Sequence, residues 1–114
     1  MTESTPFFAD FLDWRCQILT TRYTNGTLAL LMVDADDSQP IATPTVNLDG
    51  QPRHGGVFIK TWSENEGIDE ALIAAGVLEP QPVGVHPTGF VEALEYRLTT
   101  EFMKALAVQK ILSG

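Results

Sequence analysis

The dipeptide Asn25-Gly26 is the feature that most restricts what this chain can fold into. It stands between two runs of mostly apolar residues, WRCQILTTR before it and LALLMV after it. Both central positions of a two-residue type I′ turn need a positive φ, and Asn and Gly tolerate that conformation best. The sequence therefore predicts an antiparallel β-hairpin over residues 13–34.

A two-residue turn also fixes the register of this hairpin. Tyr23 would then lie opposite Leu28, and Ile18 opposite Val33. One face would carry Trp14, Cys16, Ile18, Leu31 and Val33, and the other Leu19, Tyr23, Leu28, Leu30 and Met32. Because both faces are partly apolar, we expect the sheet to be covered on both sides or to meet a partner on one side.

Three further segments are predicted to be strands, residues 41–48, 56–62 and 89–98. Pro44 has no N–H to give to a ladder, so the first of these strands is expected at a sheet edge or with a bulge. Residues 49–56 and 79–88 are rich in Gly and Pro, and we expect them to be loops.

A helix is predicted over residues 64–75. Ser63 and Glu66 have the spacing of a capping box, in which each side chain accepts the backbone N–H of the other residue. Gly76 is placed to end the helix in the left-handed conformation. Carboxylates in a first helical turn are stabilised by about 0.3–1 kcal/mol each through the helix dipole.

The two ends are predicted to add short helices to a core of residues 13–98. Thr5-Pro6 suits a helix start, and Thr99 or Thr100 can cap a terminal helix that runs to Leu112. We therefore expect a single domain over residues 1–114 of the α+β class. Its small, mainly antiparallel sheet would have four or five strands, with the 64–75 helix packed on one face.

The composition excludes several classes of protein. The net charge is −8, and residues 34–79 hold nine acids but two bases, so direct nucleic-acid binding is disfavoured because like charges repel. No apolar run approaches the roughly 18 residues of a membrane span. The acidic start is unlike a secretory signal, and the single cysteine cannot form an internal disulfide. We expect a cytoplasmic protein.

Carboxylates supply the main candidate site. The candidates are Asp34, Asp36, Asp37, Glu64, Glu66, Asp69 and Glu70. Helix capping accounts for Glu64 and Glu66, while Asp69 and Glu70 remain for another role. A metal would need oxygen ligands from several elements, which the spacing does not require, and no nucleophile accompanies the acids. We expect no metal, no cofactor and no catalytic residue, but a contact surface for a partner protein with a basic surface.

Other residues have a structural and a functional interpretation. His54 and His86 lack the spacing of a helical metal pair and are interpreted as loop residues. Cys16 is interpreted as a small packed thiol rather than a nucleophile. The phenylalanine-rich start is predicted either to belong to the core or to form an exposed docking stripe, through Phe7, Phe8 and Phe11.

Four stretches carry a resemblance to a known family. They are LLMVDADDSQPIATPTVNLDG, FIKTWSENEG, ALIAAGVLEP and GFVEALEYRL. The chain resembles, over about residues 14–98, a family of small uncharacterised proteins of bacterial phages and plasmids. The resemblance implies a mobile-element protein in a bacterial host cell. It suggests a protein that binds a host protein and inhibits a defence complex, as anti-CRISPR and anti-restriction proteins do.

Three functions are thus compatible with the sequence. The first is a non-enzymatic acidic protein that binds a host protein. The second is a small enzyme or ligand-binding domain that uses the loop around Arg53 and His54. The third is a structural homo-oligomer, formed through the phenylalanine-rich start and the terminal helix.

Overall fold

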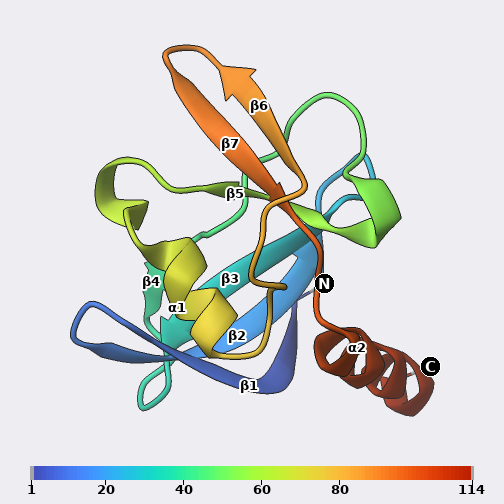
Figure 1. Ribbon diagram of the computed structural model, residues 1–114. Coiled ribbons are helices and arrows are strands. Elements are labelled where there is room, and N and C mark those ends of the chain that lie inside the picture. The colour runs from blue at the N-terminus through green and yellow to red at the C-terminus, as the bar shows by residue number, and fades with distance from the viewer. Residues whose placement is uncertain (1, 114) are drawn as a thin grey trace.

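Two antiparallel sheets and two α-helices form the α+β fold of this chain (Figure 1). The computed structural model describes residues 2–113, with the side chains of His54 and residues 109–113 left out. Sheet A consists, in spatial order, of β1 (Glu3–Phe11), β2 (Trp14–Arg22), β3 (Leu28–Asp34) and β4 (Pro40–Ala42). Sheet B consists of β5 (Val57–Lys60), β7 (Val91–Tyr96) and β6 (Gly84–Thr88). The helices are η1 (Arg53–Gly55), η2 (Ser63–Asn65), α1 (Ile68–Ala74) and α2 (Thr100–Ser113).

The hydrophobic core lies between the two sheets and the two α-helices. Its fully buried side chains come from every layer: Cys16, Ile18, Leu30 and Met32 from sheet A, Val57 and Ile59 from sheet B, Ile68 and Leu72 from α1, and Phe102 from α2. Both α-helices contact β1. The expected α+β class is confirmed, although seven strands divide between two sheets instead of forming one.

The predicted β2–β3 hairpin is present, but its turn has three residues. The Gly26 N–H donates to the Tyr23 carbonyl at 2.9 Å, and the Tyr23 N–H donates to Thr27 at 2.9 Å. Gly26 has φ 85, whereas Asn25 keeps a negative φ. This is a type I turn followed by a left-handed glycine, the usual three-residue hairpin loop.

The longer turn shifts the predicted register by one residue. Ile18 lies opposite Met32 instead of Val33, and Leu28 lies opposite Arg22 instead of Tyr23. A shift of one residue moves a strand's side chains to the other face. Leu28, Leu30 and Met32 therefore join Cys16 and Ile18 inside the core, and the face assignment made from the sequence was wrong.

The predicted strand at 41–48 is divided between the two sheets. Pro40–Ala42 pairs with β3 as the edge strand β4, with a register irregularity. Farther on, Thr45 forms a bridge with Ile59 in β5, and the Lys60 N–H donates to the Pro44 carbonyl at 2.8 Å. This segment thus connects sheet A to sheet B.

The predicted helix at 64–75 begins late, because α1 starts at Ile68. Ser63 has φ 56 and forms no side-chain cap, so the capping box is wrong. The buried Asn65 instead donates its amide to the Thr43 carbonyl at 2.9 Å, a tertiary contact that holds this turn as 3₁₀ helix. The predicted end is confirmed: Gly76 has φ 81, and the Val77 N–H returns to the Leu72 carbonyl.

The predicted helix is absent at the N-terminal end of the chain and present at the C-terminal end. The predicted helical turn after Thr5 is wrong, because residues 3–11 form strand β1. Alternate residues Thr5, Phe7, Ala9 and Phe11 are its more buried side chains, which is the period-two pattern of a strand. Helix α2 is present as expected, and the Thr99 hydroxyl caps it by accepting the Phe102 N–H at 3.0 Å.

Sheet B contains one strand that the sequence did not predict. Strands β5 and β7 fall within the expected segments 56–62 and 89–98. The expected loop at 79–88, however, contains β6, which pairs with β7 through the two-residue turn Gly89-Phe90. Gly89 has φ 66, and glycine at the first central position is what a type II′ turn requires.

Candidate functional site

The first group of predicted contact acids lies in the turn after β3. Asp34 accepts the backbone N–H of Asp36 at 2.8 Å, and Asp37 accepts that of Gln39 at 3.0 Å. Asp36 and Asp37 are exposed, while Asp34 is half-buried. These carboxylates stabilise the turn by hydrogen-bonding to their own backbone.

The second group lies on η2 and around the start of α1. Glu64 is 3.6 Å from the Lys60 ammonium; a backbone N–H hydrogen bond and the Lys60 charge lower the pKa of Glu64. Asp69 accepts the Tyr96 hydroxyl at 2.8 Å. Glu66 and Glu70 are exposed. Two of these four acids therefore have partners within the chain.

The two acidic groups do not form one continuous patch. The turn after β3 and helix α1 belong to separate elements, and the end of the β1–β2 hairpin passes between them in the view of Figure 1. Most of the excess negative charge comes from one stretch of sequence, but that stretch is distributed over the molecule.

The predicted aromatic set is also divided. Phe11 is buried in the core, and the ring of Phe7 packs edge-on against Phe102 with centroids 5.0 Å apart. Phe8 is exposed on the opposite side of β1, where the Arg15 guanidinium lies 5.4 Å from its ring centroid. Phe8 is thus the member of this set that is available to a partner.

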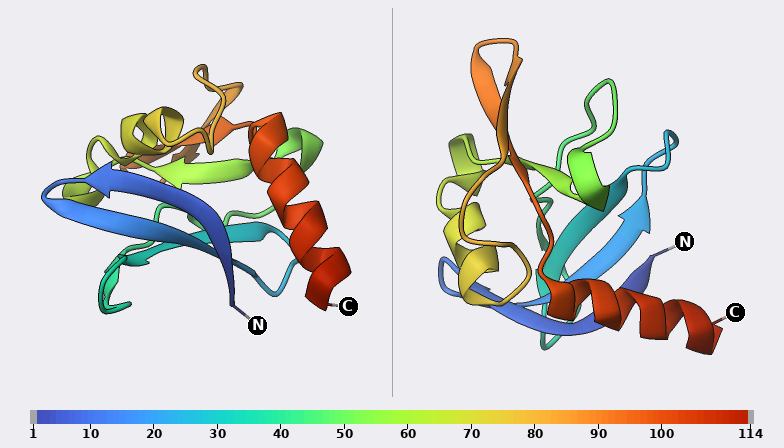
Figure 2. Two further views of the ribbon diagram at one scale, coloured as in Figure 1. Left: turned by 90° about the horizontal axis from the view of Figure 1, so that it is seen from below. Right: turned by 45° about the vertical axis from the view of Figure 1, so that its right-hand side comes forward.

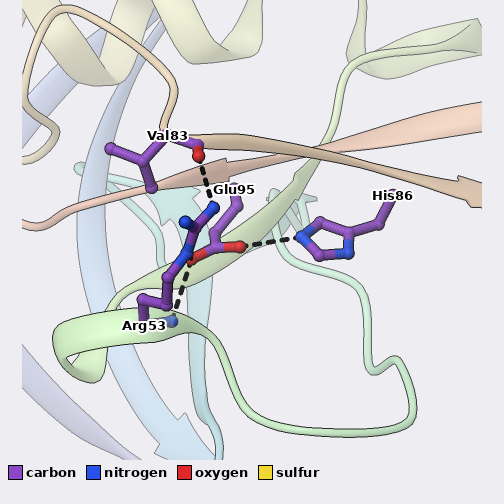
Figure 3. Close-up of polar contacts among 4 residues, drawn as sticks. All are labelled: Arg53, Val83, His86 and Glu95. Atoms are coloured by element: carbon purple, nitrogen blue, oxygen red, sulfur yellow. Dashed lines mark hydrogen bonds and ion pairs between the residues drawn. The ribbon is translucent and has the colours of Figure 1, made fainter.

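Arg53, Glu95 and His86 form a charged cluster at the base of the β6–β7 hairpin (Figure 3). The Glu95 carboxylate is almost fully buried. It accepts the Arg53 Nε–H at 3.0 Å and the Arg53 backbone N–H at 2.9 Å, and it lies 2.7 Å from His86 Nε2. The Arg53 guanidinium also donates to the Val83 carbonyl. The cluster ties η1 to both strands of the hairpin.

The electrostatics of this cluster fix Glu95 as an anion. Burial by itself would raise the pKa of Glu95, but hydrogen bonds from Arg53 and His86 and the charge of Arg53 lower it to about 2. The Arg53 guanidinium donates to Glu95 through Nε and to the Val83 carbonyl through Nη2, while its side chain stays 60% exposed. The predicted site around Arg53 and His54 stays a prediction, because the side chain of His54 lies outside the described residues.

Two further findings concern Cys16 and the possible metal ligands among the described residues. Cys16 is fully buried, and burial together with the charges of Asp34 and Asp10 raises the pKa of its thiol, which disfavours the reactive thiolate. The described residues contain no group of three or more His, Cys, Asp or Glu side chains placed to hold a metal ion. In the same part of the chain, no helix has the length and apolar character needed to cross a membrane.

A shallow groove beside the tip of the β6–β7 hairpin is the feature that sequence reasoning missed. The hairpin projects from the body of the molecule (Figure 1), since β5 pairs with β7 only as far as Ala93. The groove is lined by Thr61, Trp62, Pro87, Gly89, Phe90, Val91, Glu92 and Leu94. Phe90 at the tip is fully exposed.

The sequence held a signal for this feature. Residues 83–91 read VGVHPTGFV, in which Gly-Phe can serve as a two-residue turn between short strands. Phenylalanine is rarely placed in a tight turn for local reasons, because turn positions favour Gly, Pro, Asn, Asp and Ser. Phe90 is nevertheless fully exposed at this turn, beside the half-buried Trp62 and Val91 of the groove.

Comparison of the chain with protein-family models, with curated proteins and with solved structures gave no match.

Proposed function

We propose that this protein is a non-enzymatic binding module, and that the groove beside the β6–β7 hairpin receives a partner protein with a basic surface. The observation that carries the proposal is Phe90, a large apolar side chain fully exposed at the tip of a projecting hairpin. Trp62, half-buried in the same groove, supplies a second aromatic group. Aromatic residues are enriched among those that dominate the energy of protein interfaces.

Carboxylates at this groove favour a basic partner. Glu92 lines the groove and is exposed, and Glu64 lies two residues after Trp62 at the start of η2. The chain as a whole carries a net charge of −8. Negative potential around an apolar contact accelerates association with a positive surface and repels nucleic acid. Of the two acidic groups, the one on η2 and α1 is therefore proposed as the contact group.

The resemblance to proteins of mobile elements directs the search for this partner. We propose a nucleic-acid-binding protein of the bacterial host, whose basic groove an acidic protein would occupy. A component of a defence complex fits this description, and binding there would block access of the nucleic acid.

The test is affinity capture from a bacterial lysate with the immobilised protein and matched variants. Phe90→Ser removes the exposed aromatic group, and Leu12→Ser is the control because Leu12 is also well exposed, in the β1–β2 turn. We expect a basic protein that is captured by the original chain and by Leu12→Ser, released by high salt, and lost with Phe90→Ser. Equal capture by both variants would exclude the groove.

Charge reversal separates the two acidic groups. Glu64→Lys combined with Glu92→Lys is expected to abolish capture of that protein, because it reverses the charge beside the groove. Asp36→Lys combined with Asp37→Lys changes the net charge by the same amount in the turn after β3 and is expected to retain capture. The opposite pattern would move the contact to that turn.

A further inference from the structure

We propose that the groove beside the β6–β7 hairpin recognises an arginine side chain of the partner, stacked on the ring of Phe90 and paired with the carboxylate of Glu92. Both residues line this groove together with Trp62. The inference rests on the proposed function, because it names the chemistry by which that groove would recognise its basic partner. It goes further in separating arginine from lysine, which a net charge of −8 attracts equally.

Sheet A contains the same combination of groups with an arginine in place. Phe8 and Asp10 stand two residues apart on β1. The guanidinium of Arg15, on the neighbouring strand, lies 5.4 Å from the centroid of the Phe8 ring and 3.3 Å from the Asp10 carboxylate. One guanidinium thus contacts a ring and a carboxylate together, because its flat face is attracted to an aromatic ring while its N–H groups donate to a carboxylate.

The tip of the β6–β7 hairpin repeats the ring and the carboxylate without the cation. This tip projects from the body of the molecule in the right-hand view of Figure 2 as well as in Figure 1. Phe90 and Glu92 are also two residues apart, and both are exposed. Among the described residues, Glu92 forms no ion pair and no cation lies over the Phe90 ring. Both groups are therefore available to a guanidinium from another molecule.

The groups in this groove favour arginine over lysine. Trp62, half-buried in the groove, adds a second aromatic side chain, and tryptophan attracts cations more strongly than the other aromatic residues. A lysine ammonium is strongly hydrated and meets a carboxylate as a point charge. A guanidinium is more weakly hydrated and can donate two parallel N–H bonds to the carboxylate. We therefore expect arginine to bind here more tightly than lysine.

Two blocked peptides, acetyl-Gly-Arg-Gly-amide and acetyl-Gly-Lys-Gly-amide, test the inference by NMR titration of the full chain. They carry the same charge, so the difference between them reports the guanidinium and not the net charge of the protein. The arginine peptide should shift the indole N–H of Trp62 and the backbone amide of Phe90 with a Kd of about 1–10 mM, and the lysine peptide should bind at least about fivefold more weakly. The indole of Trp14, on sheet A, should not shift.

Three variants assign this preference to its residues. Glu92→Gln keeps the shape of the side chain but removes its charge, so it should weaken binding of the arginine peptide at least about fivefold. Phe90→Leu keeps an apolar side chain without a ring, so it should reduce the preference for arginine. Asp36→Asn is the matched control, because it removes one charge from an exposed residue in the turn after β3, and it should leave both Kd values unchanged.

Equal affinities of the original chain for the two peptides, no saturable shift with the arginine peptide, or an arginine Kd that Glu92→Gln leaves unchanged would overturn the inference. The peptide comparison is made on the original chain, so it decides the question even if a variant is unfolded. Failure of the proposed function looks different. Lysate capture that is lost with Phe90→Ser, together with equal peptide affinities, would retain the binding groove and exclude arginine recognition. Capture that is equal for Phe90→Ser and Leu12→Ser would exclude the groove as the partner site, whatever the peptides show.

Discussion

Glu95 and His86 face each other across the β6–β7 hairpin, with Oε1 of the buried carboxylate 2.7 Å from Nε2 of the ring. Arg53 approaches the same carboxylate from η1. The base of the hairpin is therefore held by charge-assisted hydrogen bonds, which are shorter and stronger than neutral ones. The tip, with Phe90, makes no such contact among the described residues. Stability and partner binding can thus be changed by different substitutions.

Replacing Glu95 with Gln should destabilise the fold by about 1–3 kcal/mol, measured by urea unfolding. The neutral amide cannot accept three donors as the carboxylate does, and the Arg53 backbone N–H would lose its charged acceptor. The exposed neighbour in the same strand provides the control: Glu92→Gln should change the free energy of unfolding by less than about 0.5 kcal/mol. Equal effects of the two substitutions would show that the cluster adds no stability.

The stability of the fold should fall at acid pH because Glu95 becomes protonated. Its folded pKa of about 2 lies below the ordinary value of about 4.3, so the unfolded chain binds the proton more readily. The stabilisation is then complete above about pH 5 and is lost as the pH falls toward 2. The difference between the folded and the ordinary pKa of Glu95 corresponds to about 3 kcal/mol of folding stability. The difference in unfolding free energy between the original chain and Glu95→Gln should shrink over this range, and a constant difference would contradict the assignment.

The sequence predicted the fold class and most elements, and its errors have local physical causes. Gly26 was expected to share a two-residue turn with Asn25, but a type I turn with a left-handed glycine satisfies the same dipeptide and shifts the register by one residue. The capping box at Ser63 was replaced because Asn65 is fixed by the Thr43 carbonyl. At the hairpin turn and at the helix start alike, the local sequence is compatible with two structures, and tertiary packing determines which of them forms.

The candidate site was harder to predict, because sequence proximity does not give proximity in space. Asp36 and Glu64 belong to the same acidic stretch of sequence, yet Asp36 lies in the turn after β3 and Glu64 lies in η2. Arg53 and Glu95 are 42 residues apart, yet they share a hydrogen bond. An ion pair formed through the pairing of β5, β6 and β7 requires the strand order, which neither composition nor periodicity supplies.

Gly84 should be sensitive to the smallest possible substitution. A Cβ atom at this position would lie 2.7 Å from Nη2 of Arg53 and 2.9 Å from Oε1 of Glu95, distances too short for van der Waals contact. Gly84→Ala should therefore cost about 1–3 kcal/mol in chemical unfolding, as overpacking typically does. In an Arg53→Ala background, part of the crowding is removed, and the added cost of Gly84→Ala should fall. Strict additivity would show that the two positions are not coupled.

Tyr96 should ionise late, and Asp69 should be part of the reason. Burial raises the pKa of the Tyr96 phenol, and the hydrogen bond to Asp69 and the negative charge of that carboxylate raise it further. Because the folded pKa lies above the ordinary value of about 10, the resulting stability is present below pH 10 and is lost as the pH rises beyond it.

Ultraviolet absorbance should show one of the two tyrosines titrating after the other. Asp69→Asn removes the charge but keeps an acceptor oxygen, so it should lower the pKa of Tyr96, whereas Glu66→Gln, an exposed acid just before α1, should leave it unchanged. Tyr96→Phe should abolish the late phase; persistence of that phase would contradict the role given to Asp69.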